Sequence, residues 1–396
     1  MTLVINSVRN DIVGQLDFGQ NLGLAAVSNI GGADLAEALS SDVQRLLFSR
    51  DAYTGENPLV TMEMHVRMRS SLVKKAALCL VRLFRTNHDI INLDGPFVEK
   101  IGYLLQDNDV GVLTSVMSLV LSITSASPGA FESILSNVID VLNRLVGEKS
   151  CPHDYQYYRI PTPWLSVKCI RYLQYYKMPE GRKWQTLNDI LSKILVKSDA
   201  YTETSNKTNA ENSILIEAIN LIIGYGTDAP AVLKQHAAGI LRRFIALKDA
   251  NIRYLALDAM TRLAVIDGPA SLQGHQALVL ESMKDLDYSV KKKALSLLFC
   301  ISDETNAKGI VEELVVILAT ADNAIKEDIV VKAAILSEKY CGGDFQWYIT
   351  TTLQIILVAG DHVADMVWYR MVQIITNHPE IHEFTAEKVL GIVQSK

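Results

Sequence analysis

Basic residues gather at three places in this sequence, one of them the pair Lys74 and Lys75, and the other two clusters are the candidates for binding a charged partner. Lys291, Lys292 and Lys293 are consecutive in DYSVKKKALSLLF, and Arg242 and Arg243 are adjacent in GILRRFI. Positive side chains grouped in this way could contact anionic lipid headgroups or the acidic surface of a partner protein. The alternative is that they form the solvated side of helices whose other side is buried. We therefore treat these five residues as candidate contacts only.

The spacing of the residues gives little indication of a metal site, a cofactor site or a catalytic site. Cys151, His153 and Asp154 could supply metal ligands, but a single Cys-x-His in a broken segment is a weak signal. His382-Glu383 lacks the second histidine of a zinc-binding helix, and no GxxxxGK[ST] or GxGxxG phosphate-binding loop occurs. The sequence therefore predicts no metal, no cofactor and no enzymatic activity.

The composition favours a folded helical protein with protein partners. Of 396 residues, 49% are hydrophobic and 21% are charged, which is too apolar for a disordered chain. Only 10 prolines and 22 glycines interrupt a sequence rich in aliphatic residues, as expected for helices and not for many short strands. The net charge of -6 disfavours nucleic acid as a partner, because phosphate binding needs a basic surface. The apolar excess of a thin helical structure suggests instead that part of its surface faces partner chains.

The cysteines and the N-terminal sequence indicate a cytoplasmic protein. Five cysteines form an odd number without a CxxC pair, as expected of small buried side chains in a reducing compartment. The opening residues MTLVINSVRNDIVG contain charges and no long apolar run, unlike a signal peptide.

One apolar stretch raises the question of a membrane span. Residues 110–131 contain no charge, and 22 residues are enough to cross a bilayer. Several serines and threonines interrupt this stretch, however, and Ser127-Pro128 resembles a helix cap followed by a proline in the first turn. We expect two helices here, the first of them buried by other helices on most sides.

A recurring phrase organises the whole chain. An aliphatic residue is followed by two or three polar or basic residues, a small or aliphatic pair, and further aliphatic residues at helical spacing. Most intervals between these phrases are near the ~40–47 residues of HEAT and armadillo units. The sequence therefore predicts an all-α fold, a HEAT/armadillo-like α-solenoid of helical hairpins. The phrases begin at Leu22, Val73, Val112, Leu165, Ala210, Ile252, Val290, Ile325 and Val363.

The flanking residues predict where these helices begin and end. Thr162-Pro163, Asp228 with Pro230, and Asp344 are suited to helix starts, and a hairpin of residues 344–359 and 363–377 is expected. Two segments rich in breakers, near 51–68 and 147–162, are predicted to be loop excursions, and no sheet is expected. Because the phrases recur from one end to the other, we predict one continuous domain over residues 1–396.

The segment from Tyr155 to Leu173, YQYYRIPTPWLSVKCIRYL, resembles the alpha-adaptin family, the large subunits of endocytic clathrin adaptor complexes. The similarity continues through NAENSILIEAINLII, DYSVKKKALSLLF and AGDHVADMVWYRMVQII, and PTPWLSVK favours alpha over the gamma large chain of the Golgi adaptor. The resemblance covers nearly the whole chain and places it in the middle of an adaptin trunk. It differs in the segment 51–68, which is longer than the family's compact turn.

The resemblance implies a scaffold for clathrin-mediated endocytosis that binds a small sigma-type chain, a beta large chain and a mu chain. It also implies peripheral association of the full complex with the plasma membrane at coated pits. In the family, a basic phosphoinositide site lies on helices expected before Met1, so no lipid-binding residue is carried over. The family's later trunk, hinge and appendage are expected after Lys396. Another helical-repeat transport scaffold, such as a Golgi adaptor, a coat subunit or a nuclear transport receptor, is the alternative.

Overall fold

The fold is built almost entirely of α-helices. The computed structural model describes residues 2–14, 16–48, 58–147, 151–196 and 205–395. The structure is 83% helical, far above the ~30–35% of an ordinary globular protein, and contains nineteen α-helices among the described residues. The prediction of an all-α, HEAT/armadillo-like fold is therefore confirmed.

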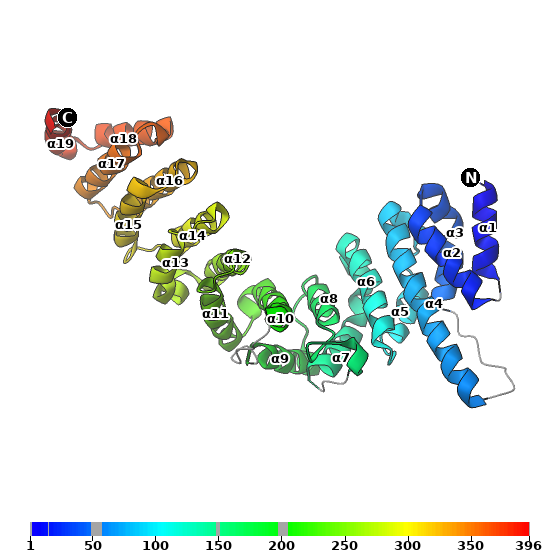
Figure 1. Ribbon diagram of the computed structural model, residues 1–396. Coiled ribbons are helices and arrows are strands. Elements are labelled where there is room, and N and C mark those ends of the chain that lie inside the picture. The colour runs from blue at the N-terminus through cyan, green and yellow to red at the C-terminus, as the bar shows by residue number, and fades with distance from the viewer. Residues whose placement is uncertain (1, 15, 49–57, 148–150, 197–204, 396) are drawn as a thin grey trace. The chain divides into compact units, whose positions relative to one another are not determined.

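The chain divides into two compact units, Met1–Asp228 and Ala229–Lys396, here called the N-terminal and C-terminal units. The single continuous domain expected from the sequence stays a prediction. In the N-terminal unit the even-numbered helices pack in succession, and each odd-numbered helix packs against the even-numbered helix that follows it (Figure 1). Its helices are α1 (Thr2–Val13), α2 (Asp17–Ile30), α3 (Ala33–Leu47), α4 (Pro58–Thr86), α5 (Gly95–Leu104), α6 (Val110–Ala126), α7 (Leu135–Val146), α8 (Pro163–Leu173), α9 (Gly181–Val196) and α10 (Ser205–Gly224).

The C-terminal unit repeats this two-row arrangement. Helices α12, α14 and α16 form one row, and α11, α13 and α15 each pack against the next member of that row (Figure 1). Its helices are α11 (Ala231–Ile245), α12 (Ala250–Asp267), α13 (Gln276–Ser282), α14 (Tyr288–Ile301), α15 (Ala307–Thr320), α16 (Asn323–Lys339), α17 (Phe345–Ala359), α18 (Asp365–Asn377) and α19 (His382–Ser395). The predicted hairpin near the C-terminus is present as α17 and α18, joined through Gly360–His362.

The uncharged stretch from 110 to 131 forms a buried helix. Helix α6 is 17 residues long and packs between α4 and α8, and Val116, Met117 and Val120 are fully buried. Proline at position 128 starts a separate 3-10 segment, Pro128–Ile134, as the sequence indicated, although the Ser127 side chain makes no capping hydrogen bond. None of the helices in the described ranges combines the length and the apolar character that a membrane span requires.

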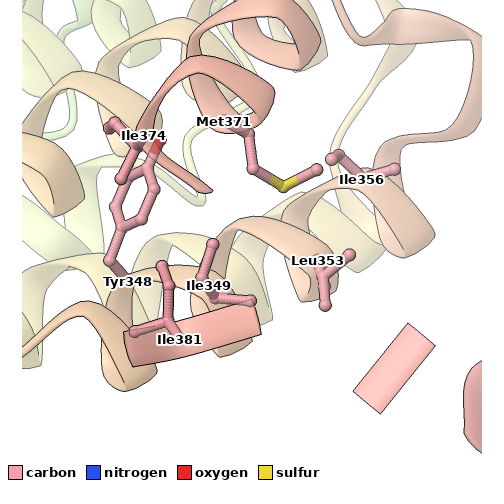
Figure 2. Packing of buried hydrophobic residues seen from close by; sticks show 7 residues of the cluster. All are labelled: Tyr348, Ile349, Leu353, Ile356, Met371, Ile374 and Ile381. Carbon is pink, nitrogen blue, oxygen red and sulfur yellow. The ribbon is translucent and has the colours of Figure 1, made fainter. Parts of the chain in front are cut away.

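Each hairpin buries its apolar side against its neighbours, and the pair α17–α18 shows how. Met371 and Ile374 point from α18 toward α17, where Ile349 is fully buried (Figure 2). Burial of such side chains is worth about 1.5–3 kcal/mol each, which is the main favourable contribution to the packing. The cluster consists of Tyr348, Ile349, Leu353, Ile356, Met371, Ile374 and Ile381.

Aspartates begin many of the helices. Asp344 accepts a hydrogen bond from the Trp347 N–H at 3.0 Å, as the sequence predicted. Asp109, Asp249 and Asp287 cap α6, α12 and α14 in the same way, each accepting bonds from two backbone N–H groups. These caps satisfy donors that the first helical turn leaves unpaired.

Two expected helix starts are different in detail. Thr162 precedes Pro163 at the start of α8, but its hydroxyl donates to the Tyr155 carbonyl at 3.2 Å and not to the helix. Asp228 ends a 3-10 turn, and Pro230 occupies the position before α11. For Thr162, the turn before the β-hairpin competes with the helix for the side chain.

The prediction of a loop over residues 51–68 is wrong for its second half, because α4 begins at Pro58. Proline is favoured in the first turn of a helix, and no Gly or Pro follows it before Arg69. The residue that we interpreted as a break therefore starts the helix. Residues 49–57 lie outside the described part of the chain.

The second excursion contains a small β-hairpin, which corrects the expectation of no sheet. Strand β1 (Gln156–Tyr157) pairs antiparallel with β2 (Ile160–Pro161), and a 3-10 turn, His153–Tyr155, precedes them. Two-residue strands are too short to produce a detectable alternation in the sequence. The rest of that excursion, 148–150, is outside the described residues.

Ile349→Ala should lower the free energy of unfolding by about 2–5 kcal/mol, because the change leaves a cavity between α17 and α18. Leu357 lies on the same helix with 40% of its surface exposed, so Leu357→Ala is the matched control and should cost much less. Urea unfolding followed by circular dichroism measures both. Equal losses for the two variants would show that α17 is not packed as described.

Candidate functional site

The three consecutive lysines of α14 are each paired with an aspartate on a neighbouring helix of the same row. Lys293 Nζ lies 2.5 Å from Asp258 Oδ1 on α12. The other two reach the start of α16 and its first turns. These pairs are Lys291 Nζ with Asp322 Oδ2 at 2.6 Å and Lys292 Nζ with Asp328 Oδ2 at 3.1 Å.

The aspartates balance the positive charge of the lysine cluster, although the lysines themselves keep their charges. Hydrogen bonds to Asp328 and Asp258 raise the pKa of Lys292 and of Lys293, respectively. The hydrogen bond from Lys291 lowers the pKa of Asp322. Lys292, Lys293 and Asp322 therefore stay ionised near neutral pH, and each of the three lysines has an aspartate beside it. The field that the cluster presents to an anionic surface is correspondingly weak.

Arg242 and Arg243 do not join the lysines. They are exposed on α11, which belongs to the other row of the C-terminal unit. Burial, followed by the positive charge of Arg242, lowers the pKa of His275. The five basic residues proposed from the sequence thus form two separate groups, in which Arg242, Arg243 and Lys292 are exposed and Lys291 and Lys293 are half-buried.

The repeated phrase of the sequence has a structural explanation. In three of its copies, the basic residue that follows the first aliphatic residue reaches an aspartate at or just before the start of the next helix in the row. The apolar residue fixes the helix in its own hairpin, and its basic neighbour links that hairpin to the next. The three pairs are Lys74–Asp109 at 2.8 Å, Arg253–Asp285 at 2.6 Å and Lys291–Asp322 at 2.6 Å.

The first of these pairs also holds the 3-10 turn before the β-hairpin. Lys74 Nζ donates to the Tyr155 hydroxyl at 3.3 Å, and Asp109 accepts from the Gly111 N–H at 2.7 Å. Partial burial would raise the pKa of Asp109, but the hydrogen bonds from Lys74 and from the backbone outweigh it and lower that pKa. A Cβ atom at Gly111 would lie 2.6 Å from both Lys74 Cε and the Tyr155 hydroxyl. Glycine is therefore needed for the two side chains to meet.

The Cys151 cluster shows no arrangement of metal ligands. Cys151 Sγ lies 3.4 Å from the Thr162 hydroxyl. Within the described ranges, no three His, Cys, Asp or Glu side chains converge as metal ligands would. Of the other cysteines, Cys79 and Cys169 are buried, and desolvation raises their pKa values to about 11 and about 12.

The turn of the β-hairpin has an unusual backbone. Tyr158 and Arg159 lie between the paired strands with φ angles of 48° and 65°, in the left-handed region that glycine or asparagine usually occupies. Each such residue costs about 1–2 kcal/mol. Arg159 lies at the edge of a groove in the N-terminal unit.

That groove has a volume of about 330 Å³ and an apolar floor. Its floor comes from the ends of α7 and α9, from β2 and from one face of α10, including Val146, Ile194 and Leu215. Arg159, Lys207 and Glu211 stand at its polar side, and Lys207 lies 3.9 Å from Glu211.

Exposed aromatic rings lie beside the groove. Tyr157 packs edge-on against Tyr158 and Trp164, with ring centroids 4.8 Å and 6.0 Å apart. Between 37% and 46% of the surface of these three residues is exposed. The sequence shows the aromatic residues plainly but not that they point outward, because the hairpin was not foreseen.

The sequence profile described as "Adaptin N terminal region" matches residues 1–395. The chain belongs to the adaptin family. Among its relatives, "AP-2 complex subunit alpha-1" of Arabidopsis thaliana is 41% identical over 392 residues, which are 98% of this adaptin and 36% of the relative. "AP-2 complex subunit alpha-2" of Dictyostelium discoideum is 38% identical over 400 residues, covering all of this chain and 38% of the relative. The resemblance to the alpha-adaptin trunk is confirmed, and the chain spans little more than a third of these relatives.

The adaptin fold is also found in a larger assembly. A "Homology model of the full-length AP-3 complex in an intermediate open conformation" contains a chain that aligns with all of this adaptin and is itself 66% covered, with a TM-score of 0.60. The sequence identity is 16%, so this similarity concerns the fold alone.

Arg253→Met should destabilise the C-terminal unit of this adaptin by about 2–4 kcal/mol. Arg253 and Asp285 have only 17% and 11% of their side chains exposed, and Arg253 also donates to the Leu247 and Lys248 carbonyls. The substitution leaves a largely buried carboxylate without its partner. Urea unfolding measures the effect.

Lys284→Met is the matched control, because Lys284 pairs with Glu281 on the same segment while both side chains are about two-thirds exposed. It should leave the unfolding midpoint unchanged. A midpoint for Arg253→Met equal to that of the control would contradict the structural role of the pairs between helices.

Proposed function

We propose that this chain is a structural scaffold subunit of an AP-2-type clathrin adaptor complex, acting in endocytosis and vesicle-mediated protein transport. The observation that carries the proposal is the match of residues 1–395 to the N-terminal region of adaptins. The identity of 38–41% to AP-2 alpha subunits over nearly the whole chain supports the alpha type. In this role the protein is not an enzyme; it acts by holding other chains in place.

The proposed partners are a small sigma-type chain, a beta large chain and a mu chain. Apolar side chains on the surface of both units support binding of other chains. In α18, Met366 and Tyr369 are more than 70% exposed and are one helical turn apart, and Phe18 of α2 is 82% exposed. Apolar groups of this size gather at protein interfaces more often than on surfaces that face only water.

The proposed location is the cytoplasmic side of the plasma membrane, at coated pits, with the membrane bound peripherally through the complex. Arg242 and Arg243 are the candidate contacts for an acidic partner or an anionic surface, because both are exposed. The lysines of α14 are weaker candidates, since each is already paired with an aspartate.

Co-expression tests the proposed assembly. The chain should co-purify with the sigma chain of an AP-2 complex, and the beta and mu chains should increase the yield. The sigma chain of an AP-3 complex, carrying the same tag, is the control and should be recovered in much smaller amount. If neither sigma chain co-purifies, or both do so equally, the proposed AP-2 sigma partner is wrong.

Vesicle sedimentation tests the role of the basic residues. We expect weak binding to phosphoinositide vesicles at physiological salt, because the protein carries a net charge of -6 and the lysine cluster is neutralised by its partners. Arg242→Ala/Arg243→Ala should lower the residual binding seen at low salt. Strong sedimentation at physiological salt that is lost in Lys291→Ala/Lys292→Ala/Lys293→Ala, with an unchanged circular dichroism spectrum, would show that the lysines are the lipid contacts.

A further inference from the structure

We propose that the groove beside the β-hairpin of the N-terminal unit binds a short peptide segment of a partner protein, in which a bulky apolar residue lies next to an acidic residue. This inference goes beyond scaffolding, because the groove lies within one unit and needs no second adaptor chain to be complete.

The apolar half of the proposed ligand follows from the floor of the groove. Val146, Ile194 and Leu215 are between 4% and 8% exposed, and their accessible surface lines a space of about 330 Å³. Such a space is large enough for one bulky side chain with part of its backbone, and filling it removes apolar surface from water on both sides.

The acidic half follows from Arg159. Its guanidinium lines the groove and is exposed, and it forms no ion pair with any residue in the described ranges. Elsewhere in this unit, arginines such as Arg9 and Arg171 are paired with Asp42 and Glu217. A carboxylate is the natural partner of a guanidinium, because it accepts two parallel hydrogen bonds.

The surroundings favour a protein ligand over a lipid. Exposed Tyr157 and Trp164 next to Arg159 provide the three residue types that dominate binding energy at protein interfaces. Glu211, which shares the polar side of the groove with Arg159 and Lys207, would repel a headgroup with several negative charges, whereas a peptide can place its N–H groups there. The left-handed backbone at Tyr158 and Arg159 supports the same conclusion, since strain of this kind concentrates at binding sites.

A random eight-residue peptide library displayed on phage, selected against the immobilised full chain, tests the proposal. We expect enriched peptides that share an apolar residue and an adjacent Asp or Glu. A fluorescent synthetic copy of the most enriched peptide should then lose at least tenfold in affinity when measured by polarisation with Arg159→Glu. Arg85→Glu is the matched control, because Arg85 is an exposed arginine of the same unit outside the groove, and it should bind as the unchanged protein does.

A charge exchange makes the test specific. Replacing the acidic residue of the peptide by lysine should abolish binding to the unchanged protein and restore binding to Arg159→Glu. Ile160→Glu, at the half-buried edge of the floor, should also lose the peptide, and circular dichroism would reveal whether that variant is folded. Selection without an acidic and apolar consensus, or peptides that bind Arg159→Glu as well as the unchanged chain, would overturn the proposal. Sedimentation of phosphoinositide vesicles that depends on Arg159 would point to a lipid instead.

Discussion

Each helical hairpin of this chain buries its apolar side against the next hairpin. The charged residues between successive helices act within this constraint. Ile329 of α16 and Leu298 of α14 are fully buried, and these two helices of successive hairpins pack against each other. The hydrophobic effect supplies most of the stability, but it is non-directional and does not by itself fix how far one helix slides along another. A row of similar helices therefore needs a second interaction that selects one alignment.

The ion pairs between successive helices meet this need. Lys293 and Lys291 connect α14 to both of its neighbours, and Lys74 connects α4 to α6. Pairs that are partly exposed contribute only about 0–1 kcal/mol, so their effect on alignment exceeds their effect on stability. The aspartates serve two purposes: Asp109 caps a helix and receives the lysine of the preceding repeat. A sequence cluster that resembles a binding patch is thus part of the connection between repeats.

The helices, their order and several of their ends could be predicted from the sequence, because the apolar period and the Asp344 cap are local signals. The partners of the lysines could not, because Lys291 and Asp322 are separated by a complete helical hairpin. Pro58 was ambiguous, since the same residue can end a helix or begin one. The groove could not be predicted either: it combines the ends of α7 and α9 with a hairpin whose strands have two residues each.

Contacts from the repeat helices also explain why the β-hairpin keeps its left-handed turn. A strained turn survives only when its surroundings determine it from both sides. Before the turn, the Tyr155 hydroxyl is held by Lys74 and the Tyr155 carbonyl by Thr162; after it, Pro163 starts α8. The pair Lys74–Asp109, which aligns two helices of the row, therefore also fixes the base of the hairpin that presents Arg159. Because Gly111 gives Lys74 and Tyr155 the space to meet, the alignment of the repeats and the shape of the groove depend on the same few atoms.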